Sequence, residues 1–397
     1  MAKRTMSASL DGVTPQTGKV AVMQTESMNK VGLAIGALNK RYGKVLLRTG
    51  KDIPYIYKMP YNEPVLDYVA DGGIPIARFT EFLGENHSGK TRNGLKQMGN
   101  FQKYCFGCHT PNTLKATWKK LTKNGEMPEL LACECSNCNN PITNIQAMVD
   151  IEGTTDPVFM RHFGIDVDGV LYTRPDMPSQ AVGIIDVLLR QSGIGLILLD
   201  SIGSMGSDKE VETAIEDEKM NQNALFFNKA LRKWQMALNS NTNEAGIENG
   251  TTMIVVNQSY VTLSLYSTEV PQGGRGLKHG KSMSLKTRIK EKTMNAEKTR
   301  TLGVHVEYKN EKNKSGVPYR VMDYYLNLDS TNPDIGYCQT NILLQYIELA
   351  IAFGIVNQSG GWFKFNGKTW QGKVKLIEDF DDEIKIAVDK IVYNKEN

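Results

Sequence analysis

The chain has 397 residues, enough for two or three folded units, and its 40% hydrophobic and 23% charged residues are typical of a globular protein. The net charge of +4 is too small to mark a nucleic-acid-binding protein by itself. No apolar run approaches the roughly 18 residues of a membrane span, and the N-terminus lacks the apolar core of a signal peptide, so we expect a cytoplasmic protein with no membrane partner.

The N-terminal region, residues 1–59, is predicted to hold a flexible segment and one helix. The first 28 or so residues are polar. Val31, Ile35, Leu38 and Tyr42 then share one helical face, which predicts an amphipathic helix. Its apolar stripe must be buried on its own domain or on a neighbouring chain.

Residues 60–330 alternate short apolar strands with helices, which predicts an α/β core with a mainly parallel sheet covered on both faces. The predicted strands are 78–84, 147–152, 169–175, 195–200 and 252–258, and the longest predicted helices are 179–193 and 223–240. A ligand site should lie at the carboxyl ends of these strands.

Residues 331–397 predict a small α+β C-terminal lobe. A helix is expected over 341–356, a hairpin over 362–370 that turns at Asn366 and Gly367, and a last helix over 382–392.

A phosphate-binding loop is predicted in the first strand-to-helix connection. The segment GENHSGKT, residues 84–91, matches G-x-x-x-x-G-K-[ST] in full. Its N–H groups would converge on phosphate oxygens, Lys90 would reach the β- and γ-phosphates, and the Thr91 hydroxyl would hold Mg²⁺. A chance glycine-rich turn is the other interpretation, which the flanking strand and helix disfavour. The predicted ATP-binding residues here are Gly84, Glu85, Asn86, His87, Ser88, Gly89, Lys90 and Thr91.

Three later strands lead into polar side chains that suit the same site. Asp200 ends an apolar strand and is expected near Mg²⁺, generally through water. Glu152 follows a strand expected beside the phosphate-loop strand, where a carboxylate can activate water for attack on the γ-phosphate; an ordinary surface acid fits the sequence equally well. Gln258 stands at another predicted strand end, where its amide could sense the γ-phosphate, or simply terminate the strand.

Five of the six cysteines lie within 34 residues. Two CxxC pairs have the spacing of a tetrahedral zinc site, with four thiolates for one ion. Cys133 and His109 are spare ligands, and an iron–sulfur cluster, a catalytic thiol or reduced core cysteines are the alternatives. The predicted zinc ligands are Cys105, Cys108, Cys135 and Cys138.

These motifs, in this order, resemble the RecA family of recombinases from about residue 31 to about residue 375. The segments TEFLGENHSGKT, VDIEGTTDPVF, LLDSIGSM and VVNQ carry the resemblance. It implies that Glu152 is the catalytic glutamate, that Asp156 and Phe159 contact adenine, and that Ser201 belongs with Asp200 to the second nucleotide motif. Gln258 would couple the nucleotide state to DNA binding.

The resemblance also implies two loops that face DNA. The first is about 207–220, and the second follows Gln258. The second loop offers glycines for close approach, aromatic rings for stacking and basic residues for phosphates, which suits single-stranded DNA; a long disordered surface loop is the alternative. The predicted DNA-binding residues are Met220, Arg232, Tyr260, Gly273, Gly274, Arg275 and Lys278.

Lys312 and Lys314 match family lysines that reach the ATP of the neighbouring subunit and stabilise charge on the transferred phosphate. His279 stands where bacterial members have an aromatic residue important for communication between subunits, and the first DNA loop is acidic. These differences concern the details of DNA contact and coupling more than the ATPase.

The family has a short connection where this chain has residues 102–141, so the resemblance implies that the cysteines belong to an insertion in the core, which we predict to be a zinc ribbon. Its basic stretch TWKKLTKNG, with Trp118, would suit contact with DNA or a partner protein, and a stabilising insertion is equally compatible.

The resulting hypothesis is a DNA-dependent ATPase that uses ATP and Mg²⁺ and catalyses strand exchange. It would form homo-oligomeric filaments on single-stranded DNA and pair them with double-stranded DNA, with single-strand-binding or loading proteins as possible partners. We expect it in the cytoplasm of a bacterium or of a phage-infected cell. The alternatives are a ring helicase or branch-migration motor, and a weakly hydrolysing DNA-coating or mediator protein.

Overall fold

The computed structural model describes residues 17–42, 55–119, 127–191, 193–205, 221–245, 250–261, 269–272 and 274–393. The chain divides into two units, 1–54 and 55–397, each of which is described by itself. In the first unit, helix α1 (Thr17–Tyr42) begins earlier than the sequence pattern predicted. Val31 and Leu33 on this helix are exposed.

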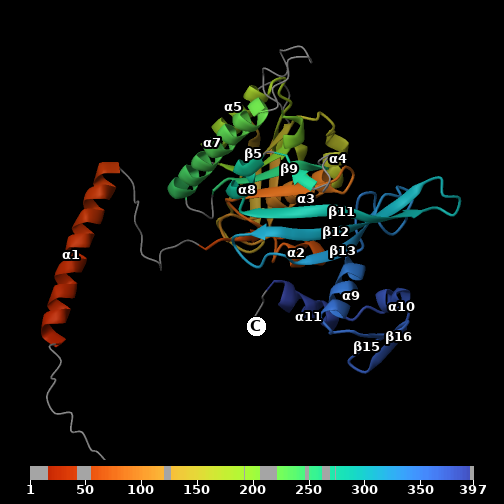
Figure 1. Cartoon of the computed structure of the whole chain (residues 1–397). Coiled ribbons are helices and arrows are strands. Elements are labelled where there is room, and N and C mark those ends of the chain that lie inside the picture. Colours follow the sequence, from red (N-terminus) through yellow and green to blue (C-terminus); the bar gives the residue numbers. More distant parts are fainter. Residues whose placement is uncertain are drawn as a thin grey trace, which may run out of the picture. The chain divides into compact units, whose positions relative to one another are not determined.

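The second unit is built around a mixed sheet (Figure 1). Within the described residues the sheet has nine strands, in the order β13-β12-β11-β3-β9-β8-β6-β7, with β10 beside β9. Neighbours from β11 to β7 are parallel, and β10, β12 and β13 are added antiparallel, which confirms the predicted mainly parallel core. The bounds are β3 (Phe79–Gly84), β6 (Ile145–Asp150), β7 (Val170–Thr173), β8 (Ile194–Asp200), β9 (Thr252–Val261), β10 (Glu269–Pro271), β11 (Met283–Met294), β12 (Thr301–Asn313) and β13 (Val321–Asn327).

Helices cover both faces of this sheet, and the side-chain alternation of the strands explains why. Along β8, Leu196 and Leu198 join the core under α3 (Lys90–Gln102). The intervening Ile197 and Leu199 join a second core under α5 (Pro178–Leu189) and α7 (Asn221–Ala245), which lie side by side in Figure 1. All four side chains are fully buried, each contributing roughly 1.5–3 kcal/mol of transfer free energy. A strand buried on both faces therefore reads as an uninterrupted apolar run.

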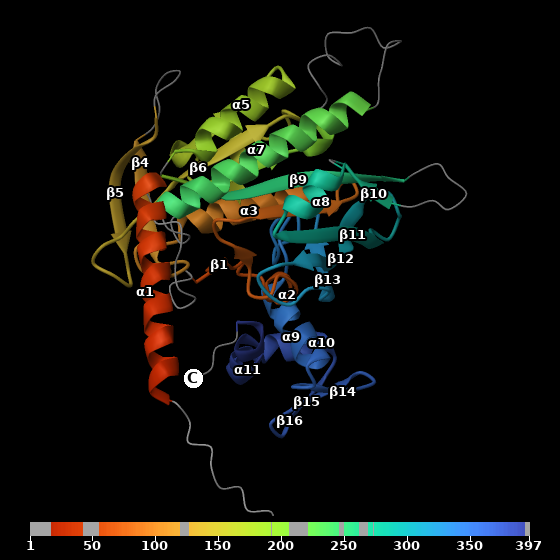
Figure 2. The same ribbon diagram turned by 60° about the vertical axis from the view of Figure 1, so that its left-hand side comes forward.

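The cysteine-rich insertion forms a hairpin of β4 (Leu114–Lys119) and β5 (Glu129–Cys135), seen beside the sheet in Figure 2. It leaves the core after α3 and returns at the start of β6, where the Ile145 amide donates to the Gly193 carbonyl. The hairpin is thus attached at the amino-terminal edge of the parallel strands, opposite the edge at which their ligand site is expected.

The C-terminal lobe consists of three helices and a small sheet. Asn366 and Gly367 have φ values of 45° and 79°, so the β15–β16 hairpin has the predicted turn with both central residues left-handed. The bounds are α9 (Ile342–Ala352), β14 (Asn357–Ser359), β15 (Trp362–Phe365), β16 (Lys368–Gln371), α10 (Lys373–Glu378) and α11 (Asp382–Val392).

The remaining described elements are short and connect these layers. They are β1 (Lys58–Met59), α2 (Pro64–Val69), β2 (Ile74–Pro75), α4 (Pro157–His162), the 3₁₀ turns η2 (Val167–Gly169) and η3 (Ile202–Ser204), and α8 (Gly274–Gly280). Among the described helices, none has the length and apolar character to cross a membrane.

A buried carboxyl group joins the core to the lobe. Asp67 of α2 is fully buried and accepts hydrogen bonds from the Tyr61 amide (2.5 Å), the Glu63 amide (3.2 Å) and the Tyr393 hydroxyl (2.7 Å). Burial, together with the nearby Glu63 carboxylate, raises the pKa of Asp67 to about 7, although the hydrogen bonds from Tyr61 and Tyr393 oppose the shift.

This raised pKa should make stability depend on pH. Between about pH 4 and 7 the folded protein keeps a proton on Asp67 that the unfolded chain has released, so the contribution of Asp67 to the free energy of unfolding falls as the pH rises through this window. We expect wild type to lose about 2.5 kcal/mol of unfolding free energy relative to Asp67→Asn between pH 5 and pH 8. Urea unfolding of both proteins across this range measures it, and parallel curves would contradict the assignment.

Candidate functional site

The loop between β3 and α3 has the backbone shape that a phosphate-binding loop needs. Gly84 has φ 153°, and a Cβ atom there would lie 2.3 Å from the Thr287 carbonyl oxygen. Gly89 has φ 90° and precedes the first turn of α3. Both positions therefore require glycine, and the loop delivers the unpaired amides of a helix N-terminus to the mouth of the site.

Side chains within this loop hold it closed. Ser88 donates to the Glu85 carbonyl (2.7 Å) and shares a hydrogen bond with the Thr287 hydroxyl (2.6 Å). The Lys90 ammonium group donates to the same Glu85 carbonyl (2.6 Å). Burial lowers the pKa of Lys90, although the carboxylates of Asp200, Glu152 and Glu85 oppose the shift. In contrast to these buried groups, Glu85, Asn86 and His87 are exposed.

Thr91 and Asp200 form a site whose donor atoms suit Mg²⁺. The Thr91 hydroxyl donates to one carboxylate oxygen of Asp200 (2.6 Å). The other oxygen, Oδ1, is buried and has no hydrogen-bond partner among the described residues. Burial, together with the Glu152 and Asp150 carboxylates, raises the pKa of Asp200 to about 6, although the hydrogen bond from Thr91 opposes the shift. A hydroxyl beside a carboxylate with a spare oxygen matches the hard oxygen ligands that Mg²⁺ prefers.

Glu152 follows β6, and the expectation that this strand lies beside the phosphate-loop strand was wrong, because β9 and β8 lie between β3 and β6. One side chain that follows β8 and one from β9 hold Glu152 in place. The Ser201 hydroxyl (2.5 Å) and the Gln258 amide (3.1 Å) both donate to its Oε1 atom. The register explains the meeting, because Asp150 pairs with Asp200 and Gly84 pairs with Gln258 at the carboxyl edge. The structure therefore brings the phosphate loop, Glu152, Asp200, Ser201 and Gln258 to one edge of the sheet.

The expectation that Gln258 ends its strand was wrong. β9 continues to Val261, but its parallel pairing with β3 stops at Gln258, and the residues beyond pair antiparallel with β10. At Gln258 the strand therefore changes its pairing from β3 to β10 and does not turn. The strand pattern of residues 252–258 does not indicate this change.

Asp156 and Phe159, the predicted adenine contacts, lie at the start of α4. Asp156 caps the helix by accepting from the Val158 amide (2.6 Å) and the Phe159 amide (3.1 Å). The Phe159 ring packs edge to face on Phe163, with 5.0 Å between centroids. These contacts fix the helix start, and the adenine role stays a prediction.

The predicted DNA-binding residues are only partly described. Arg232 of α7 and Lys278 of α8 are exposed, and the two helices are joined by a hydrogen bond from the Gly276 amide to Asn228 (2.9 Å). Gly274 and Arg275 begin α8, and Tyr260 lies in β9. Met220 and Gly273 lie outside the described residues.

Lys312 and Lys314 cover the end of α8. The Lys312 ammonium group donates to the Lys278 carbonyl (2.6 Å), and that of Lys314 donates to the His279 carbonyl (3.0 Å). Partial burial lowers the pKa of Lys312 to about 8, with neighbouring Lys314 adding to the effect. In this chain the two lysines therefore contact the carbonyl-rich end of a helix, which favours cations.

Two residues that sequence reasoning missed shape the site. Asp150 accepts from the Gly153 amide (2.7 Å), the Thr155 amide (3.1 Å) and the Tyr172 hydroxyl (3.0 Å), and so folds the loop that carries Glu152. Because Asp150 directly follows the apolar residues of a predicted strand, the sequence pattern could have identified it as a candidate site residue. Thr287, which packs on the phosphate loop, had none, because it lies about two hundred residues away in sequence.

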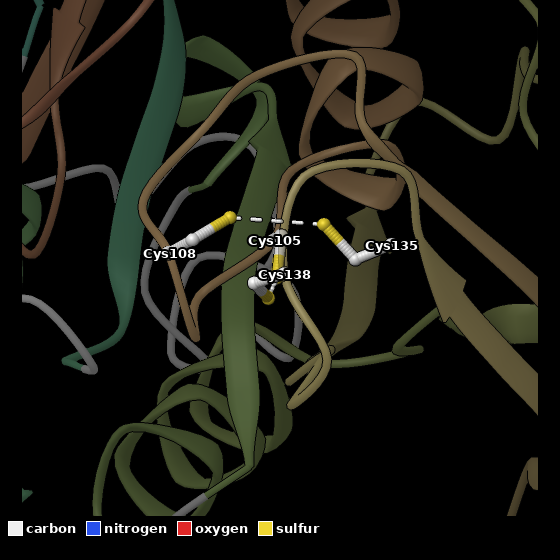
Figure 3. Close-up of side chains that lie close together, drawn as sticks. All are labelled: Cys105, Cys108, Cys135 and Cys138. Carbon is white, nitrogen blue, oxygen red and sulfur yellow. Dashed lines mark hydrogen bonds between the residues drawn. The ribbon is translucent and has the colours of Figure 1, made fainter.

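The four cysteines of the two CxxC pairs meet at one point (Figure 3). Their sulfur atoms all lie within 4.8 Å of one another, with Cys105–Cys138 and Cys108–Cys135 separations of 3.7 Å. Four thiolates at about 2.3 Å from a tetrahedral Zn²⁺ would be about 3.8 Å apart. The cluster is thus compatible with one zinc ion.

The spare ligands stand outside this cluster. The His109 ring stacks on Tyr57, with 4.1 Å between centroids, and its Nδ1 atom contacts the Tyr104 hydroxyl at 3.2 Å. Among the described residues, the group that could hold a metal contains neither His109 nor Cys133.

Trp118 does not present its ring to a partner, contrary to one interpretation of the insertion. Its side chain is buried against η2, where a Cβ atom on Gly169 would lie 2.4 Å from Nε1 of Trp118. Phe106, beside Cys105, is also buried in the main core. Apolar contacts therefore anchor the insertion to the core.

Comparison with known proteins supports the identity that this geometry suggests. Residues 133–330 match the model of the RecA N-terminal domain. Protein RecA of Chlorobaculum tepidum is 26% identical over 385 residues, covering 94% of each chain. Protein RecA of Nautilia profundicola is 26% identical over 92% of this chain and 90% of its own, and that of Frankia casuarinae is 27% identical over 86% and 84%. Together with the phosphate loop and the sheet order, these similarities show that the chain belongs to the RecA family.

Proposed function

We propose that this chain is an ATP-dependent DNA recombinase. It would polymerise on single-stranded DNA, align that strand with a homologous duplex and exchange strands. The observation that carries the proposal is the position of Glu152, whose Oε1 atom accepts from both Ser201 and Gln258 beside a complete phosphate loop. Similarity to proteins named RecA over nearly the whole chain supports the same reaction class.

ATP would bind with its phosphates on the loop 84–91. Lys90 would exchange the Glu85 carbonyl for a phosphate oxygen, and Thr91 and Asp200 would hold Mg²⁺, which neutralises phosphate charge. Glu152 would accept a proton from the attacking water. Ser201 and Gln258 both donate to one oxygen of this carboxylate, and these two hydrogen bonds would fix its orientation toward the water.

Nucleotide and DNA would communicate through Gln258. Its side chain reaches Glu152, and its backbone lies immediately before the segment predicted to face DNA. Lys312 and Lys314 would leave the end of α8 to reach the ATP of a neighbouring subunit in the filament. Binding of a neighbour's nucleotide would then also alter the contacts of α8.

The four-thiol centre would hold one structural Zn²⁺. Its ligands would be Cys105, Cys108, Cys135 and Cys138, none of which forms a disulfide. Two knuckles that close on one ion would clamp the hairpin where Phe106 and Trp118 pack on the core.

The proposal is tested by ATP hydrolysis with and without single-stranded DNA, followed by electron microscopy of the same sample. We expect DNA to stimulate turnover at least about tenfold, and helical filaments to form with ATP and DNA. Closed rings would favour the helicase or branch-migration alternative. Negligible turnover in both conditions would instead favour a DNA-coating or mediator protein.

A further inference from the structure

A buried polar network lies behind the site, centred on Glu81 of β3. The Glu81 side chain is fully buried. Its Oε1 atom accepts from the Asn257 amide (2.8 Å), and its Oε2 atom accepts from the Ser284 hydroxyl (2.6 Å) and forms an ion pair with Lys281. Lys281 also donates to Ser284 (3.0 Å), and all four side chains are more than nine-tenths buried.

The network contacts both ends of the segment that contains α8, residues 272–281. At its start, the Asn257 amide that donates to Glu81 also donates to the Gln272 carbonyl (2.9 Å). At its end, Lys281 directly follows α8 and pairs with the other oxygen of Glu81. One carboxylate thus connects β3 to both sides of residues 272–281.

The same network fixes the backbone of Gln258. The Asn257 side-chain oxygen accepts from the Gln258 amide (2.9 Å), and the Gln258 carbonyl accepts from the Gln272 amide (3.1 Å). A movement of Gln258 therefore has to be shared by Asn257, and through Asn257 by Glu81 and the start of the α8 segment.

Burial makes this arrangement cooperative. A carboxylate and an ammonium group that are removed from water are tolerated only when they are paired and their remaining hydrogen-bonding capacity is met. Breaking one contact leaves a buried charge or amide unsatisfied, so the members tend to hold together or rearrange together. A network of this kind can transmit a displacement between the elements that it joins.

We infer that Glu81 is a positioning residue that couples Gln258, and hence the state of the nucleotide, to the α8 segment. The inference rests on the proposed function for its consequence, which is that nucleotide binding alters the DNA-facing side of the protein. Because Glu81 is fully buried, it would act through Asn257 and Lys281.

The first test compares Glu81→Gln with wild type. Glutamine keeps the size of the side chain but leaves Lys281 without a counter-charge. We expect the stimulation of ATP turnover by single-stranded DNA to fall at least about fivefold, while turnover without DNA and the KM for ATP change less than about threefold. Stimulation equal to that of wild type in the folded variant would overturn the inference.

A matched control is available in Glu63→Gln. Glu63 is also a buried carboxylate paired with a buried cation, Arg92, but it joins α2 to α3. The Glu63→Gln substitution should lower thermal stability about as much as Glu81→Gln does. It should leave unchanged the ratio of ATP turnover with single-stranded DNA to turnover without DNA. If both variants lose the ratio equally, the effect of Glu81 is one of general stability and the inference fails.

The double variant Glu81→Gln, Lys281→Met separates positioning from stability. It removes both charges, so we expect the melting temperature to recover toward that of wild type. The stimulation ratio should stay low, because a methionine side chain in place of Lys281 cannot tie the end of α8 to β3. Recovery of the ratio together with the melting temperature would overturn the inference.

A readout independent of DNA and of turnover is hydrogen–deuterium exchange of peptides that span residues 272–281. In wild type, a non-hydrolysable ATP analogue with Mg²⁺ should change exchange in this segment severalfold, and in Glu81→Gln this change should disappear. If wild type lacks DNA-stimulated turnover, the proposed function fails, yet this measurement still decides the inference. A nucleotide response that is identical in the two proteins would overturn it.

Discussion

Replacing Glu152 by glutamine should lower the rate of ATP hydrolysis about 100-fold or more, because an amide cannot accept a proton from the attacking water. The hydrogen bonds around Glu152 can be kept by glutamine. Ser201 and Gln258 both donate to Oε1, and a glutamine carbonyl oxygen can accept the same two hydrogen bonds. The loop, the magnesium ligands and the fold should therefore be unaffected, and the KM for ATP should change less than about threefold.

The measurement is steady-state ATP turnover with saturating single-stranded DNA, alongside DNA binding in the presence of ATP. The variant should bind DNA at least as tightly as wild type, since ATP stays intact. Glu129→Gln is a suitable control, because Glu129 forms an exposed ion pair with Lys119 on the inserted hairpin. It should keep turnover within about twofold. Comparable turnover in Glu152→Gln and wild type would assign water activation to another group.

The nucleotide site was predictable because its information is local. The phosphate loop is a contiguous motif, and its glycines Gly84 and Gly89 have positive φ values that other residues rarely adopt. Asp200 ends an apolar strand and Glu152 follows another, and parallel strands bring their carboxyl ends to one edge. Strand direction alone predicts this common edge, whereas the pairing of β6 with β8, which brings Glu152 close to Asp200, is known only from the sheet order.

Contacts between residues that are far apart in the sequence could not be predicted. Thr287 packs on the phosphate loop because β11 lies beside β3, a neighbour relation that no local pattern encodes. Likewise, no local pattern pairs Glu81 with Lys281, and only the position of β11 beside β3 makes them a buried ion pair. Trp118 was one candidate for contact with DNA or a partner protein, but its side chain is buried against η2.

The positions of the two candidate sites have a physical consequence. The nucleotide residues lie at the carboxyl edge of the parallel strands, whereas the cysteine-rich hairpin enters and leaves at the amino edge. The length of the strands therefore separates the four-thiol centre from the phosphate loop. The two sites should respond independently to substitution, which makes metal loss a test of stability and not of nucleotide chemistry.

Replacing Cys135 by serine should remove the bound metal and destabilise the hairpin, because a structural zinc site contributes directly to folding and three thiolates hold the ion far less well than four. We expect the metal content of the purified protein to fall from about one zinc per chain to near zero. The melting temperature should fall on the order of 10 °C, since loss of the clamp also loosens the core contacts of Phe106 and Trp118. Nucleotide affinity at a temperature where the variant is folded should change less than about threefold.

Cys133→Ser is the matched control, because Cys133 lies two residues earlier on the same strand, outside the four-thiol group. It should keep both the metal and the melting temperature of wild type. Metal analysis and thermal unfolding of the two variants decide the ligand set. Loss of metal from Cys133→Ser but not from Cys135→Ser would move the site to the alternative ligand, and a chromophore with iron in the wild type would identify an iron–sulfur cluster in place of zinc. Equal stability of all three proteins, with no metal in any of them, would mean that apolar contacts alone fold the hairpin around reduced thiols.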